Sequence, residues 1–137
     1  MIVDAAGDPV AAGWLRTLRS TGEYVYSGCY SARPLPGETQ PSVHVAFPLE
    51  HGNVQVFLKP RALAGGGLEL DSPAGQFGGN GAYVKVDEGG THATRVPIHE
   101  TFTLYVDEEG TLRTDHNLRL WSASVLRLHY KLLPVQA

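Results

Sequence analysis

Hydrophobic and polar residues alternate with a period of two along most of the chain after residue 22. Such alternation is typical of β-strands that bury one face. It is clearest in the last third of the chain, where we predict three consecutive antiparallel strands at 98–107, 111–121 and 125–132. Six earlier segments show the same pattern and predict strands at 23–31, 42–49, 54–59, 68–71, 82–87 and 91–97.

Residues 9–20 carry the signals of a helix instead. Asp8 is a favourable N-cap, and Pro9 at the first helical position loses no hydrogen bond. Trp14 and Leu18 then follow at a spacing of four, which places them on one side of a helix. We predict one amphipathic helix of about three turns ahead of the strands.

One helix and about nine strands with short connections indicate a mostly β protein with a single domain over 1–137. An antiparallel sheet of this width has to curl, close or split into layers. Consecutive hairpins favour a closed up-and-down β-barrel with the helix at one end. A two-layer β-sandwich is the alternative that the same pattern allows.

The order and number of these elements resemble the calycin architecture of lipocalins and fatty-acid-binding proteins. The resemblance lies in the architecture and not in a motif. Gly13 and Trp14 are adjacent, so the Gly-x-Trp signature of lipocalins is absent. The predicted helix also precedes the first strand, whereas in fatty-acid-binding proteins the helices follow it. The resemblance implies a barrel interior that holds a hydrophobic or amphipathic ligand.

Composition and charge narrow the classes of function. The net charge of −3 and the isoelectric point near 6.0 provide no basic surface for nucleic acid. No apolar run approaches the roughly 18 residues that span a bilayer. Cys29 is the only cysteine, which excludes an internal disulfide and suits a reducing compartment. The first residues lack the pattern of a signal peptide, so we expect a soluble, cytoplasmic protein.

Glu100 and His116 are two polar residues on an otherwise apolar strand face. A turn at 107–110 sets the register of the hairpin and places Phe102 opposite His116, with Thr114 one pair further along. Glu100 is then a diagonal neighbour of His116, within reach of a hydrogen bond. The pair would serve as a polar anchor for a ligand, or as a base and its orienting partner. Alternatively, the pair lies at a barrel mouth or faces water.

Tyrosines provide a second candidate surface. Tyr24, Tyr26 and Tyr30 share one face of their strand. A tyrosine has an apolar body and a polar tip, which suits the wall of a ligand cavity, although core packing explains each of them as well. The predicted ligand-binding residues are Glu100, His116, Phe102, Thr114, Tyr24, Tyr26 and Tyr30.

These features predict a module that binds a small hydrophobic or amphipathic molecule inside a barrel. One alternative is an interaction domain without a cavity that forms a homodimer, and another is a small enzyme that uses the Glu-His pair. We favour a non-enzyme without cofactor or metal, because the histidines lack ligand spacing and Cys29 lacks activating neighbours. The binding module predicts an internal cavity lined by tyrosines, and the interaction domain predicts a self-complementary patch.

Overall fold

The computed structural model describes residues 1–18, 20–87 and 89–134. Within these ranges the chain forms eleven β-strands and no helix, and so no helix of the length and hydrophobicity needed to span a membrane. The strands are β1 (Ile2–Val3), β2 (Pro9–Thr17), β3 (Tyr24–Arg33), β4 (Ser42–Leu49), β5 (Gly52–Ala62), β6 (Leu68–Asp71), β7 (Gly81–Val86), β8 (His92–Val96), β9 (Ile98–Val106), β10 (Leu112–Leu120) and β11 (Ala123–Leu132). All nine strands predicted from the alternation are therefore confirmed, with shifts at their ends.

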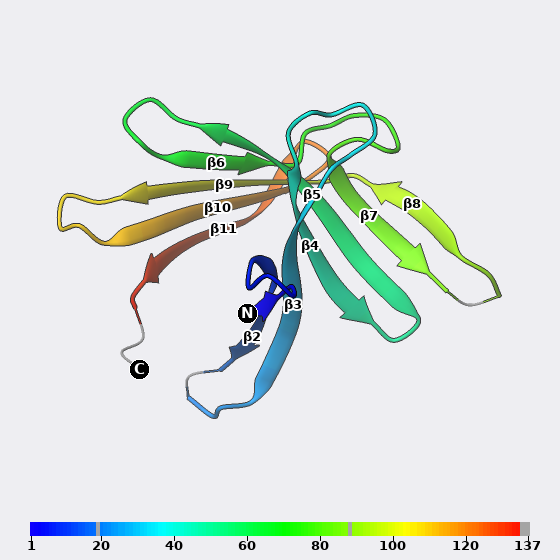
Figure 1. Ribbon diagram of the computed structural model, residues 1–137, viewed down its shortest axis with the longest axis horizontal. Coiled ribbons are helices and arrows are strands. Elements are labelled where there is room, and N and C mark those ends of the chain that lie inside the picture. Colours follow the sequence, from blue (N-terminus) through cyan, green and yellow to red (C-terminus); the bar gives the residue numbers. More distant parts are fainter. Residues whose placement is uncertain (19, 88, 135–137) are drawn as a thin grey trace.

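Strand β5 is the branch point of the sheet. Its first half, from Gly52 to Phe57, pairs with β7, and its second half, from Lys59 to Ala62, pairs with β6. The main path runs in the order β1-β2-β3-β4-β5-β6-β9-β10-β11, while β7 and β8 form a side arm. Every pairing is antiparallel. The strands lie close together near β5, and their far ends splay apart (Figure 1).

The prediction of a closed barrel is wrong, because the strands form one open sheet. Closure requires the first and last strands to pair with a consistent tilt and stagger. Here the two ends of the sheet are linked by a side-chain contact, in which Arg16 of β2 donates to the Tyr130 hydroxyl of β11 at 3.3 Å. The β7–β8 arm takes two strands out of the sequential order. The single open sheet also differs from the alternative of a two-layer sandwich.

The prediction of a helix over 9–20 is wrong as well, since residues 9–17 form β2. Trp14 lies opposite Gly28 of β3. A Cβ atom on Gly28 would lie 2.6 Å from the indole nitrogen, so the glycine makes room for the ring. An isolated three-turn helix is marginal in water, whereas β2 gains a hydrogen-bonded ladder and buries this ring. The spacing of four between Trp14 and Leu18 fits one face of a strand as well as one face of a helix.

The core lies where β4, β5, β6 and β7 meet. Its buried hydrophobic residues are Val45, Val56, Leu58, Leu70 and Ala82. We call the face of the sheet that carries these residues the inner face and the opposite one the outer face. Phe102 and Leu104 of β9 pack against the core, so that β9 and β10 present their even-numbered residues to the inner face.

The C-terminal hairpin has the predicted register. Asp107 donates its backbone N–H to the carbonyl oxygen of Thr111 at 2.9 Å, and Gly110 has a positive φ of 75°. Phe102 is paired with His116, and Thr114 follows at the next pair on the inner face. Turn chemistry therefore determined which side chains share the inner face of this hairpin.

Candidate functional site

The Glu-His pair lies on the inner face of β9 and β10. His116 Nε2 and Glu100 Oε1 are 3.6 Å apart, and the two side chains are 10% and 14% exposed. Ser72, which is fully buried, holds the backbone of Glu100: its hydroxyl accepts from the Glu100 N–H at 2.7 Å, and its own N–H donates to the Glu100 carbonyl at 2.9 Å. The predicted neighbourhood is confirmed, at a distance longer than an ordinary hydrogen bond.

The His116 ring is held mainly by packing. It is stacked on Phe102 with ring centroids 3.9 Å apart. Both ring nitrogens are buried and lack a hydrogen-bond partner among the described residues. His116 is therefore buried on both ring nitrogens, and the Glu100 carboxylate is the more exposed member of the pair. The use of this pair as a base and its orienting partner stays a prediction.

The tyrosine face of β3 packs into an aromatic cluster. The Trp14 ring lies 5.0 Å from Tyr26 and 5.8 Å from Tyr30, and Phe47 lies 5.9 Å from Tyr26. Tyr24, at the start of the strand, is 61% exposed and lies outside this cluster. Two of the three predicted tyrosines therefore face the interior, where packing with other rings occupies them.

Arg16 joins this cluster to the far end of the sheet. Its guanidinium lies 4.9 Å from the ring centroid of Trp14, 4.8 Å from that of Tyr26 and 5.3 Å from that of Tyr130. Cation–π contacts of this kind contribute about 0.5–2 kcal/mol each. The contact brings the inner faces of β2, β3 and β11 together without a backbone ladder between β2 and β11.

Members of both predicted sets lie on the inner face of the sheet. Burial, followed by the negative charge of Glu100, raises the pKa of Tyr30 to about 12. Tyr30 of β3 and Phe102 of β9 both pack against the buried core. Thr114, which is 6% exposed, lies on the same inner face. The role of these residues in ligand binding stays a prediction.

The raised pKa of Tyr30 predicts a specific alkaline sensitivity. The folded state favours the neutral phenol of Tyr30. Its contribution to the free energy of unfolding is therefore complete below the pKa of the unfolded chain, 10.0, and is lost as the pH rises through the pKa of the folded chain, about 12. We expect about 2–3 kcal/mol of stability to disappear between about pH 10 and about pH 12. Tyr30→Phe should lose this part of the pH dependence, measured by urea unfolding on either side of the interval.

Tyr24→Phe is the matched control, because it removes an exposed hydroxyl from the same strand. We expect it to keep the alkaline profile of the wild type. Identical profiles for Tyr30→Phe and Tyr24→Phe would contradict the assignment.

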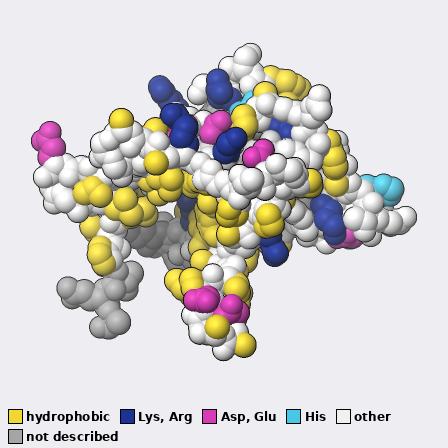
Figure 2. Space-filling model, turned by 45° about the horizontal axis from the view of Figure 1, so that its top comes forward, with side chains coloured by type: hydrophobic (Ala, Val, Ile, Leu, Met, Phe, Trp, Pro, Cys, Tyr) yellow, Lys and Arg dark blue, Asp and Glu magenta, His cyan; other side chains and the backbone are white. Residues whose placement is uncertain are grey.

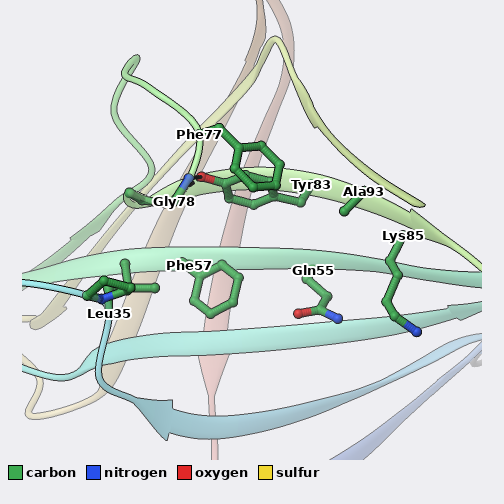
Figure 3. Close-up of a pocket in the computed structure, with 10 residues that line it drawn as sticks. Leu35, Gln55, Phe57, Phe77, Gly78, Tyr83, Lys85 and Ala93 are labelled. Carbon is green, nitrogen blue, oxygen red and sulfur yellow. Dashed lines mark hydrogen bonds between the residues drawn. The ribbon is translucent and has the colours of Figure 1, made fainter. Parts of the chain in front are cut away.

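A second site, which the sequence did not predict, lies on the outer face between β5, β7 and β8 (Figure 3). It is a mainly apolar cavity of about 300 Å³, which we call the outer cavity. It is lined by Leu35, Pro36, Gln55, Phe57, Phe77, Gly78, Gly79, Tyr83, Lys85 and Ala93. None of the seven predicted ligand-binding residues belongs to it. The sequence held one indication of this cavity. Phe57 and Tyr83 are aromatic residues that alternate with the core residues Val56 and Ala82, so they lie on the face of the sheet that would otherwise be polar.

Hydrogen bonds fix the loop that covers this cavity. The Tyr83 hydroxyl accepts from the Gly78 N–H at 3.1 Å and donates to the Gly79 carbonyl at 2.7 Å. Arg95 donates to the Gln76 carbonyl at 2.8 Å and to the Tyr83 hydroxyl at 3.2 Å. The loop between β6 and β7 is thus tied to β7 and β8.

Exposed hydrophobic side chains form a third feature. Five of them lie on the inner face of the β6-β9-β10-β11 part of the sheet and are 37% to 65% exposed. These residues, which we call the apolar stripe, are Leu68, Val106, Leu112, Leu126 and Leu132. Figure 2 shows hydrophobic side chains open at the surface on the left of the molecule, where the ends of these strands lie.

Strand β11 also leaves one backbone edge free. It is ten residues long and pairs with β10 alone within the described part of the chain. A free edge presents a row of N–H and C=O groups that can pair with another strand. The edge and the apolar stripe are continuous, because Leu126 and Leu132 belong to both.

No family model, curated protein or solved structure matches this chain. What it shares with calycins is coarser, namely antiparallel pairing of all described strands. Its function has to be inferred from its own surfaces and contacts.

Proposed function

We propose that this protein is an interaction domain whose working form is an assembly of two or more copies of the chain. One observation carries the proposal: the accessible surface of the single chain is 9484 Å². A folded monomer of 14.8 kDa is expected to expose about 7,000 Å². The chain therefore exposes about 2,500 Å² more than a self-sufficient monomer of its mass.

The size of this excess fits an obligate interface. Permanent complexes bury about 2,000–5,000 Å² in total, counted over both partners. Two copies that each covered most of their excess surface would reach the upper part of this range. The small size of the core supports the same proposal, since its buried cluster holds five hydrophobic residues among those that the structure describes. Association would complete a core that one copy leaves open.

The apolar stripe and the free edge of β11 favour a second copy of this chain as the partner. Two β11 edges can pair in antiparallel fashion across a two-fold axis, which brings the same patch of each copy together. This arrangement places Leu126 and Leu132 of the two copies side by side, so that the two apolar stripes become one continuous surface. Charged residues such as Arg127 and Lys131 alternate with them and point to the outer face, where they stay in water. A net charge of −3 opposes the association only weakly.

Sedimentation velocity of the wild-type protein tests the proposal. We expect a mass that is a multiple of 14.8 kDa and persists on dilution. In the same sample, hydrogen exchange should be slow along both edges of β11, because partner strands would protect the amides that a single chain leaves free. A mass of one chain at all concentrations would refute the proposal.

The prediction of a carrier for apolar ligands relied on the interior of a closed barrel. The antiparallel strand order supports the calycin resemblance behind it, and the open sheet weighs against it. We therefore rank a carrier below the interaction domain. Cys29, as the only cysteine, supports a reducing compartment such as the cytoplasm as the place where the assembly works.

A further inference from the structure

We propose that the outer cavity binds a small amphipathic anion with a flat apolar body and a carboxylate at one end. This goes beyond the proposed function, because the cavity lies on the outer face of β5, β7 and β8, whereas assembly is assigned to the inner face and the edge of β11. Both sites can therefore be occupied in the same molecule.

Three aromatic rings form the apolar walls. The rings of Phe57 and Tyr83 are 5.9 Å apart at 80°, and those of Phe77 and Tyr83 are 5.3 Å apart at 89°. Figure 3 shows Phe57 on one side of the cavity and Phe77 with Tyr83 on the other, with Leu35 at one end. Aromatic edges and faces arranged in this way favour a flat ring between them. A cavity of about 300 Å³ admits a small ligand of this kind.

The cavity is built before any ligand arrives. Tyr83 and Arg95 hold the loop through four hydrogen bonds, to Pro73, Gln76, Gly78 and Gly79, so that Phe77 is placed at the mouth although its side chain is 67% exposed. Gly81 permits this arrangement, since a Cβ there would lie 2.3 Å from Arg95 Nη2. A binding surface that is already ordered loses little entropy when the ligand binds.

A positively charged side chain at one end of the outer cavity favours a ligand with a negative charge. Lys85 is the only charged side chain among the ten residues that line the cavity, and it lies at the end away from Leu35 (Figure 3). Its ammonium group carries three donors, and the Asp87 carboxylate accepts one of them. Asp87 forms an ion pair with Lys85, whose two other donors have no partner among the described residues and can bind an anionic group. The Gln55 amide nitrogen donates to Asn53 Oδ1 at 2.9 Å, so the anionic end of the ligand is assigned to Lys85 alone.

The test uses three probes of one shape: 1-naphthoate, the neutral 1-naphthamide and the cationic 1-naphthylmethylamine. Binding is followed by NMR titration of the labelled, assembled protein. We expect naphthoate to shift the amide signals of residues 76–79, 55–57 and 83–85, and to bind about fivefold more tightly than naphthamide. The amine should bind more weakly than both. Absence of shifts at these residues overturns the site, and equal affinities for the three probes overturn the anion.

Variants test the apolar walls and the anion contact separately. Lys85→Gln should reduce naphthoate affinity to that of naphthamide and leave naphthamide binding unchanged. Phe77→Ser should weaken both probes, because it removes an exposed ring from the cavity mouth. Lys59→Gln is the matched control on β5, outside the cavity, and should change neither. Naphthoate affinity that is unchanged in Lys85→Gln, or reduced equally in Lys59→Gln, overturns the role of Lys85. The mass of the assembly is measured in the same samples, so a failure of association is recognised separately.

Discussion

The double replacement Leu126→Glu and Leu132→Glu is expected to convert the assembly into single chains of 14.8 kDa. In a single copy Leu126 is 41% exposed and Leu132 is 43% exposed. Carboxylates at these positions should therefore change the folding stability of the isolated chain only slightly. In the assembly the carboxylates of the two copies would lie side by side on the paired β11 strands, where like charges repel and the apolar contact between the leucines is lost. Sedimentation velocity measures the outcome. This is the largest effect that the structure predicts for any change on the surface.

Lys131→Glu is the matched control for that variant. It changes the charge by two units on the same strand, but on the outer face beside Leu132. We expect it to keep the mass of the wild type, and circular dichroism should show that both variants retain their β structure. If the double variant kept the wild-type mass, the inner face of β11 would not be the interface.

Leu58→Ala is expected to be the most destabilising replacement in the core, with a loss of about 2–5 kcal/mol in the free energy of unfolding. Leu58 is 1% exposed and lies on β5 where the pairing changes from β7 to β6. A cavity there removes packing from both arms of the sheet at once. Because natural domains are stable by about 5–15 kcal/mol, a loss of this size is a large fraction of the total.

Urea unfolding at one fixed protein concentration measures this effect, because unfolding of an assembly depends on concentration. Leu15→Ala is the control, since its side chain is 65% exposed and its loss should change stability by no more than about 0.5 kcal/mol. A loss for Leu58→Ala no larger than that for Leu15→Ala would contradict the position of the core.

The neighbourhood of Glu100 and His116 shows what local patterns can predict. The turn at Asp107 and Gly110 has a defined geometry, and a defined turn sets the register of the two strands that it joins. Once the register is known, the face of every side chain in the hairpin follows. For this reason the 3.6 Å contact between Glu100 and His116 could be expected from the sequence.

The helix predicted over 9–20 shows where local patterns are ambiguous. A spacing of four residues, as between Trp14 and Leu18, satisfies the period of a helix and of a strand alike. A residue outside this segment favours the strand over the helix, because Gly28 of β3 leaves the space that the Trp14 ring fills. No feature within 9–20 contains that information.

The sequence by itself determined the β class, nine of the strands and the faces of the C-terminal hairpin, because alternation and turn chemistry act over a few residues. Only the tertiary structure decided that β5 divides between β6 and β7, that the sheet stays open, and that Phe57, Phe77 and Tyr83 meet at one cavity. These features depend on which strand edges pair across long stretches of chain. Such pairing depends on packing between segments that are far apart in the sequence. The alternating pattern of a strand is the same whichever strand it pairs with, so the pattern does not identify the neighbour.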